Sequence, residues 1–258
     1  MRGLYLSEGA MLVQQSQLDN ISNNLANLRT NGYKRDHNVE TSFAEWMLYE
    51  LYPEEEQGRN RQLRPLGSKA HNVATHETVT SFAQGPLNVT GRNLDFALVG
   101  DGFFQVEGEE EVLYTRNGRF ELDEEGNLVT TEGYPVLGEG GPIQLESEEV
   151  YAHSDGTLYQ VDEDGNTDEI DTLDIAVFDL AEAGLEKYGE NYFTTEDAPD
   201  GEEEFEVVQG FLEGSNANLA REMTDMMKVR RSYEAAQKIM ITYDQILDRA
   251  ANELGASV

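Results

Sequence analysis

The sequence predicts an α+β protein in which long N- and C-terminal coiled-coil helices pack together and a mainly antiparallel β domain is inserted between them. Three observations lead to this fold class. Apolar residues repeat every seven positions near both ends of the chain, short alternating runs separated by turn signals fill the middle, and most of the acidic charge lies in that middle region. With 258 residues, the chain is long enough for one or two domains with apolar cores.

The C-terminal segment carries the more regular repeat. From Met226 to Leu254 the apolar residues alternate at intervals of three and four, which is the pattern of a coiled-coil seam. Asn216 or Asn218 can cap the start of this helix, and Gly255 can end it. The predicted helix therefore has about 38 residues and a length of roughly 57 Å at ~1.5 Å per residue.

The N-terminal segment supplies a second, less regular apolar stripe. Leucines and a methionine recur every seven residues from Leu4 to Leu25, and the pattern stops before Gly32, a plausible left-handed terminator. Amide side chains flank the stripe, and buried amides specify register at some cost in stability. We predict that the two helices pack on each other and that copies of the chain continue the seam. Two amphipathic helices in an ordinary bundle are the alternative.

Charge divides the chain into segments. The net charge is −33, of which −30 falls on residues 91–210, while residues 1–90 and 211–258 are nearly neutral. We expect four parts, namely an N-terminal helix (1–35), a connector with extended and loop segments (36–90), an acidic β domain (91–210) and a C-terminal helix (211–258). The excess acid has two explanations, a salt-rich or alkaline habitat or a basic partner.

Composition also excludes classes of partner. A strongly acidic chain is not suited to bind the phosphate backbone of nucleic acid or anionic lipid. No apolar run is long enough for membrane insertion, and the N-terminus lacks the features of a cleaved signal peptide. The stretch 54–72 has few apolar residues and four basic ones, and we expect an exposed, solvated loop or flexible segment there, in preference to a specific site for an acidic partner.

No catalytic, cofactor-binding or metal-binding constellation is found, so the chain is not expected to be an enzyme or to need a cofactor. The chain has no cysteine, and its four histidines lack metal-ligand spacing. Asp162, Asp164, Asn166 and Asp168 resemble the start of a calcium loop, but Thr167 stands where an EF-hand requires glycine. An acidic turn is the preferred interpretation over a calcium-binding or hydrolytic site.

Several short runs together resemble one protein family, the bacterial flagellar basal-body rod and hook proteins. The runs are SNNLAN (22–27), NGYK (31–34), LDFALVGDGFF (94–104), YTRNG (114–118), LVT (128–130), QGFLEGSN (209–216), EMT (222–224) and RSYEA (231–235). They occur in the order typical of the family and extend almost to both termini. The resemblance is to the proximal- and distal-rod subfamilies, since hook protein itself is usually longer.

The resemblance implies a structural subunit of the flagellar rod, the axial drive shaft between motor and hook, which self-assembles through its terminal helices. Its partners would be copies of itself in a helical axial assembly, other rod and hook subunits, and the flagellar export apparatus, through which it would leave the cytoplasm without a cleaved signal. An extracellular β-domain adhesin or binding module on a helical stalk is the alternative. The residues expected at the assembly interface are Leu18, Ile21, Asn23, Asn24, Leu25, Asn27, Leu28, Leu219, Met226, Val229, Tyr233, Ala236, Met240, Tyr243 and Leu247.

Overall fold

A computed structural model gives the fold of the chain and divides it into two compact units. It describes residues 2–42, 46–50, 64–69, 73–147, 149–161, 167–179, 184–189, 191–195, 197–199 and 205–255. The first unit comprises Met1–Asn23, Asp36–Val79 and Ala220–Val258, and the second comprises Asn24–Arg35 and Thr80–Leu219. The segment that follows the N-terminal helix therefore belongs to the second unit.

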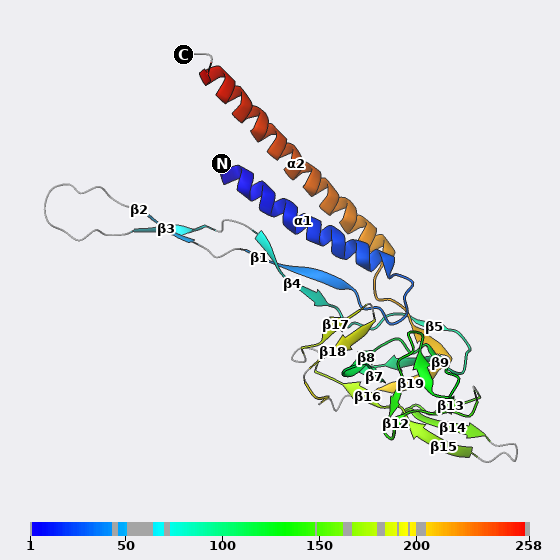
Figure 1. Cartoon of the computed structure of the whole chain (residues 1–258). Helices are drawn as coiled ribbons and strands as arrows, with labels where there is room; N and C mark the ends of the chain where they lie inside the picture. Colours follow the sequence, from blue (N-terminus) through cyan, green and yellow to red (C-terminus); the bar gives the residue numbers. More distant parts are fainter. Residues whose placement is uncertain are drawn as a thin grey trace. The chain divides into compact units, whose positions relative to one another are not determined.

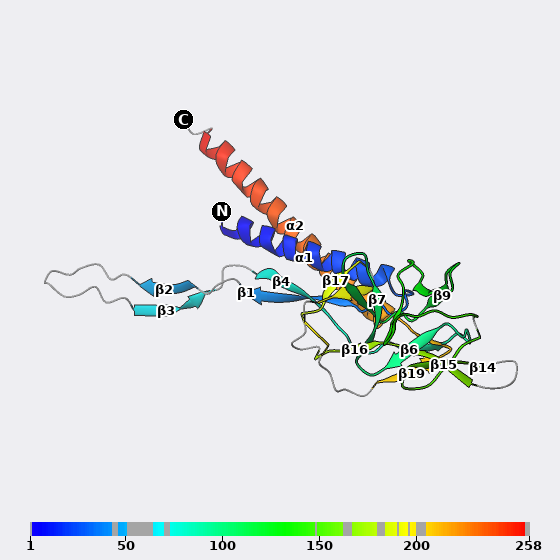
Figure 2. The same cartoon turned by 60° about the horizontal axis from the view of Figure 1, so that its bottom comes forward.

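The first unit contains the two helices of the described chain. They are α1 (Arg2–Ala26), whose last turn belongs to the second unit, and α2 (Leu219–Gly255). Both views show the two helices running antiparallel, with α2 continuing past the start of α1 (Figures 1 and 2). The unit also contains two ribbons of two strands each. Strand β1 (Asp36–Ser42) pairs with β4 (Val73–Thr80), and β2 (Trp46–Glu50) pairs antiparallel with β3 (Arg64–Lys69).

The prediction of long coiled-coil helices packed together is wrong, although the α+β layout with a mainly β region between two helices is present. A coiled coil requires contacts between matching seam positions of both helices along their length. In α2 the seam is covered only as far as Met240, and Tyr243 and Leu247 are 41% and 52% exposed. Among the side chains of α1 whose burial is described, the buried ones are Ser7, Val13, Ile21 and Asn24, of which only Ile21 is an apolar residue of the predicted seam.

Helix length accounts for part of this difference. α1 has 25 residues and α2 has 37, so α1 spans roughly 37 Å and α2 roughly 55 Å at ~1.5 Å per residue. The shorter helix is too short to cover the whole seam of the longer one. A heptad pattern records which side of a helix is apolar, and it does not specify what covers that side.

The β1–β4 ribbon is tied to α1 through one asparagine. Asn38 of β1 donates from Nδ2 to Ser16 Oγ at 3.1 Å, and its Oδ1 accepts from Asn20 Nδ2. The same Oδ1 accepts from Thr78 Oγ1 of β4 at 3.1 Å. Since each of these polar groups finds a partner within the unit, the ribbon holds a fixed position along the polar side of α1.

The second unit is built from short antiparallel strands. A five-stranded sheet has the order β16-β7-β8-β18-β17, and β13-β14-β15 form a three-stranded sheet, while the remaining strands pair as β6–β19, β5–β20, β9–β10 and β11–β12. The strands are β5 (Leu87–Val89), β6 (Phe96–Val99), β7 (Gly102–Glu107), β8 (Val112–Thr115), β9 (Phe120–Leu122), β10 (Leu128–Thr130), β11 (Leu137–Gly138), β12 (Gly141–Pro142), β13 (Tyr151–Ala152), β14 (Thr157–Val161), β15 (Thr167–Thr172), β16 (Ile175–Val177), β17 (Glu186–Tyr188), β18 (Tyr192–Thr194), β19 (Glu206–Gln209) and β20 (Phe211–Glu213).

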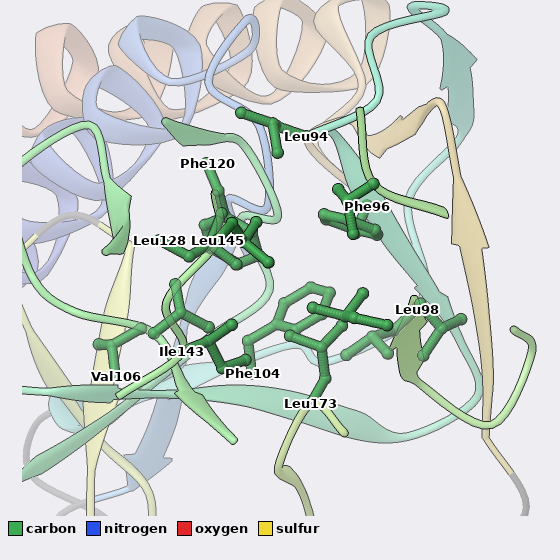
Figure 3. Close-up of a cluster of buried hydrophobic side chains, with 14 of the residues drawn as sticks. Leu94, Phe96, Leu98, Phe104, Val106, Phe120, Leu128, Ile143, Leu145 and Leu173 are labelled. Atoms are coloured by element: carbon green, nitrogen blue, oxygen red, sulfur yellow. The ribbon is translucent and has the colours of Figure 1, made fainter. Parts of the chain in front are cut away.

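Strand β7 is buried on both faces, and this organises the core of the second unit. Phe104 and Val106 point into the larger apolar cluster, where Phe104 packs edge-to-face on Phe120 with ring centroids 5.3 Å apart (Figure 3). The neighbouring Phe103 points to the other face and joins a second cluster that includes Phe193. Successive side chains of a strand alternate between faces, so two adjacent phenylalanines can serve two cores.

The acidic residues surround this core. Among the described acidic residues between positions 91 and 210, Asp95 alone is buried, and Arg92 Nη1 lies 3.4 Å from its Oδ1. The remaining described carboxylates of this region are exposed or half-buried, and few cations lie among them to offset their mutual repulsion.

We predict that salt stabilises the protein. Raising NaCl from about 0.01 M to about 1 M shortens the distance over which exposed carboxylates repel one another, so the melting temperature should rise by several degrees. Differential scanning calorimetry on the full chain, with a sucrose series as the control for general exclusion effects, measures this. A melting temperature that does not change with NaCl would contradict the prediction and favour a basic partner as the reason for the acidity.

Candidate functional site

The structure places the predicted interface residues in two groups. The buried or half-buried group comprises Leu18, Ile21, Asn24, Leu25, Asn27, Leu28, Met226, Val229, Tyr233, Ala236 and Met240. The exposed group comprises Asn23, Leu219, Tyr243 and Leu247. The central part of the predicted seam is therefore shielded within the chain itself, and its two ends in α2 are available to other molecules.

Helix α2 also exposes large apolar side chains that the heptad pattern does not include. They are Met223, Met227, Ile239, Ile241 and Ile246, of which Met227 and Ile246 are 59% and 56% exposed. Together with Leu219, Tyr243 and Leu247 they form what we call the exposed apolar set of α2. Exposed apolar side chains that gather on one side of a helix mark an interaction surface more often than single, scattered ones do. The signal in the sequence was that α2 has more apolar residues than one seam can use.

The exposed apolar set falls on two sides of the helix. At ~100° per residue, Leu219, Met223 and Met227 follow one line, and Ile241 lies about five full turns from Met223 on the same side. We call these four residues face 1. The other four define face 2, which is centred about half a turn away around the helix. Face 2 consists of Ile239, Tyr243, Ile246 and Leu247.

The second unit contains a buried ion cluster where the segment after α1 meets the segment before α2. Lys34 Nζ lies 2.7 Å from Glu213 Oε1, and both side chains are buried. Lys34 Nζ also donates to the carbonyl oxygens of Phe82 and Ala83 at 3.2 and 3.1 Å, and the Gly85 N–H donates to Glu213 Oε1 at 2.7 Å. Charge-assisted bonds of this kind are about twice as strong as neutral ones.

Arg116 is the second cation near Glu213. Its Nη1 lies 3.6 Å from Glu213 Oε2 and its Nη2 lies 3.9 Å from Asp101 Oδ1, while its guanidinium stacks 4.8 Å from the centre of the Phe103 ring. The guanidinium nitrogens are buried and make no hydrogen bond with the described residues. Glu213 therefore has two buried cations as neighbours, and the ion contacts and the ring together offset the desolvation of Arg116.

Burial affects the titration of both cations. Desolvation lowers the pKa of the Lys34 ammonium, and the Glu213 carboxylate opposes part of this shift. Desolvation likewise lowers the pKa of the Arg116 guanidinium, against the attraction of Glu213 and Asp101. The Glu213 carboxylate therefore offsets part of the desolvation cost of two buried positive charges.

Asn216 joins the same segments through hydrogen bonds. Its Oδ1 accepts from the Arg35 N–H at 2.8 Å, and its Nδ2 donates to the carbonyls of Ser81 and Ala83 at 2.7 and 2.8 Å. The Asn216 N–H donates to the Tyr33 carbonyl at 3.3 Å. We call Lys34, Arg116, Glu213 and Asn216 the junction cluster. The sequence indicated no role for Lys34, Arg116 or Glu213, and it offered Asn216 only as one of two possible helix caps; α2 begins at Leu219, directly after the other candidate, Asn218.

Gly32 allows the backbone to reach this cluster. Its N–H donates to the Glu213 carbonyl at 2.8 Å, and its φ is +70°, a conformation that costs other residues free energy. A Cβ at this position would lie 2.4 Å from the Asn117 backbone nitrogen. Both the conformation and the close contact therefore require glycine.

Metal sites and membrane-spanning helices are absent from the described residues. The described residues contain no group of three or more His, Asp or Glu side chains arranged to hold a metal, and no helix among them is long and apolar enough to cross a bilayer. Asp162, Asp164 and Asn166 of the suspected calcium loop lie outside the described residues, as does His71. Asp168 is exposed on β15.

Helix α2 exposes large apolar side chains, which is typical of a surface that contacts other protein molecules. Three family models match consecutive parts of the chain: "Flagella basal body rod protein" over residues 4–34, "Flagellar hook protein FlgE/F/G D1 domain" over 97–168 and "Flagellar basal body rod FlgEFG protein C-terminal" over 208–254. These regions contain the runs that carried the resemblance in the sequence, except that the run 94–104 begins three residues before the second region.

Relatives over nearly the whole chain agree with the family models. The flagellar basal-body rod protein FlgG of Agrobacterium fabrum is 32% identical over 98% of this chain and 100% of its own length. FlgG of Bacillus subtilis is 32% identical over 98% of both chains, and FlgF of Rhizobium meliloti is 31% identical over 99% of this chain and 98% of its own. The chain belongs to the flagellar basal-body rod protein family and is a structural subunit of that rod.

We predict that Gly32→Ala destabilises the protein by about 3 kcal/mol or more, because a left-handed alanine costs about 1–2 kcal/mol and the backbone of Asn117 must also move. Gly91→Ala is a matched control, since Gly91 has a φ of +72° but no atom within 4 Å of the added Cβ. It should cost only the conformational part. Denaturant unfolding of both variants measures the difference, and equal losses would refute the role given to the contact at Gly32.

Proposed function

We propose that the chain builds the axial part of the rod by self-assembly through α2, and that it transmits torque as part of the drive shaft between motor and hook. The observation that carries this proposal is the exposed apolar set of α2. Eight large apolar side chains that are 41–59% exposed are a persistent free-energy cost, and burying the exposed part of each is worth about half of the 1.5–3 kcal/mol of a fully exposed side chain. The proposed partners also include other rod and hook subunits and the flagellar export apparatus. This apparatus would carry the chain out of the cytoplasm without a cleaved signal.

Two apolar faces suit a growing filament better than a closed dimer. A contact between face 1 of one copy and face 2 of another buries the exposed half of eight side chains, which is worth on the order of 10 kcal/mol, while association costs about 4–15 kcal/mol. A contact through one face is therefore marginal, and a copy that contacts neighbours through both faces is held more firmly. Contacts between different surfaces of identical subunits generate open helical arrays when the rotation does not close. We propose that face 1 of one copy packs on face 2 of the next.

The shielded part of the seam has a separate role in this proposal. Met226, Val229, Tyr233, Ala236 and Met240 are covered in the isolated chain, so they would support the position of α2 within the subunit. A binding module that used its helices only as a stalk would not need two further apolar faces on α2. The proposed assembly interface is therefore narrower than the one the sequence predicted, and it includes residues outside the seam.

We predict that Met227→Asp and Ile246→Asp each abolish polymerisation of the purified full-length chain, because each places a charge in one apolar face. Thr224→Asp and Thr242→Asp are the matched controls. Both threonines are exposed on α2, lie between the two faces, and donate to carbonyls four residues earlier at 2.7 and 2.8 Å. The controls should polymerise like the unmodified chain in sedimentation and electron microscopy, with circular dichroism confirming equal helix content.

Mixing the two interface variants gives a sharper test of the pairing between faces. The aspartate at position 227 disables face 1 and leaves face 2, whereas the aspartate at position 246 disables face 2 and leaves face 1. The mixture should form dimers that do not grow, and neither variant alone should form them. Polymers from the mixture, or polymers from either variant by itself, would refute the proposed contact between face 1 and face 2.

A further inference from the structure

We infer that the junction cluster is a positioning device for assembly, in which Glu213 and Asn216 set where the chain leaves α1 and enters α2. The inference rests on the proposed function, since it concerns how the assembling helix is presented. Glu213 is buried and Asn216 is half-buried in the second unit, and their side chains contact other segments of this chain. They would therefore act through the segments they hold.

Glu213 collects groups from separate parts of the chain. Its carboxylate contacts Lys34 from the segment after α1, the Gly85 N–H from the segment before β5, and Arg116, which directly follows β8. Its backbone carbonyl accepts from the Gly32 N–H. These segments are distant in sequence. The charge of Glu213 is therefore fully compensated only when all of them are in place.

The chain distance from the cluster to each helix is short. Asn24 in the last turn of α1 accepts a hydrogen bond from Tyr33 Oη at 3.1 Å, and Lys34 follows Tyr33 directly. Asn216 precedes Leu219, the first residue of α2 and of face 1, by three positions. Because so few residues intervene, a shift of either segment changes the point at which a helix begins or ends.

The backbone also fixes which charge belongs at each place. Two carbonyls, those of Phe82 and Ala83, face the Lys34 ammonium, and one N–H, that of Gly85, faces the Glu213 carboxylate. An exchange of the two charges would point an anion at carbonyl oxygens and a cation at an N–H group. The site therefore accepts one arrangement of the chain and opposes others.

Stability alone gives a weaker account of the cluster. Replacing a buried ion cluster by apolar side chains is often neutral or stabilising, whereas removing one partner leaves an uncompensated charge. Groups of this kind can be retained because they select one arrangement of the chain, as a buried asparagine does in a coiled coil. A role in positioning and a role in stability predict different results for assembly, and the two can be separated by experiment.

Hydrogen exchange of the full-length, unassembled chain tests the inference without reference to polymerisation. In Glu213→Gln, exchange at the Gly85 amide should accelerate by about tenfold or more relative to amides of the five-stranded sheet, because its charge-assisted bond to the carboxylate is lost. The Gly32 amide donates to the Glu213 backbone carbonyl, and its exchange should accelerate as well because the ion pair of Lys34 no longer holds the two segments together. The charge-swapped double variant Lys34→Glu/Glu213→Lys should not restore the protection of these amides against exchange, since the backbone groups are oriented for the original charges. Unchanged exchange in Glu213→Gln, or protection restored by the charge exchange, would overturn the inference.

The second test compares the assembly rates of two variants, Asn216→Ala and Gln209→Ala, in which an uncharged side chain is replaced. It does not depend on whether Glu213→Gln folds. Asn216→Ala removes a side-chain amide that bridges Arg35, Ser81 and Ala83. Gln209→Ala is the matched control, because Gln209 likewise bridges the backbone of Asn93, Val150 and Ala152 within the second unit. Each loses comparable hydrogen bonds without leaving a charge buried.

At a temperature at which denaturant unfolding shows both variants to be folded, Asn216→Ala should polymerise about tenfold more slowly than Gln209→Ala. Equal rates would show that the cluster contributes stability only, and would overturn the inference. Failure of the proposed function gives a different pattern: Met227→Asp and Ile246→Asp would polymerise normally, whatever the result of hydrogen exchange at Gly32 and Gly85.

Discussion

The Glu213 carboxylate is shared by two buried cations, and the arrangement of the second unit depends on that sharing. Lys34 and Arg116 lose the solvation of water on burial, and their positive charges are acceptable there because one carboxylate lies beside both. Lys34 comes from the segment after α1, and Glu213 ends the strand before α2. The electrostatic requirement of this pair therefore brings together two ends of the chain that are 179 residues apart.

The two helices connected by this cluster differ in how their apolar residues are used. Part of the α2 seam is covered within the subunit, whereas faces 1 and 2 remain in contact with water. A subunit of a helical array needs both kinds of surface, one to hold its own parts together and one to bind neighbours. The acidic shell of the β unit does not oppose such contacts, because the region that includes α2 carries almost no net charge.

Much of the local structure could be predicted from patterns in the sequence. The seven-residue repeat indicated the helix that runs from Leu219 to Gly255, and turn signals between short alternating runs indicated the antiparallel strands. Of the candidate interface, the sequence supplied Leu219, Tyr243 and Leu247 as members of the exposed set, while it missed Met227 and Ile246. A heptad analysis considers only one side of a helix, so apolar residues on other sides received no role.

The sequence by itself determined the family, the α+β layout, the acidic character of the β unit and the location of long helices at both ends, because these follow from local composition, motifs and periodicity. Tertiary structure alone decided which side chains stay exposed on α2 and that the seam is not a continuous coiled coil. It also decided that Lys34, Arg116 and Glu213 form one buried cluster. These features arise from contacts between residues far apart in the chain, and neither spacing nor residue type specifies such contacts.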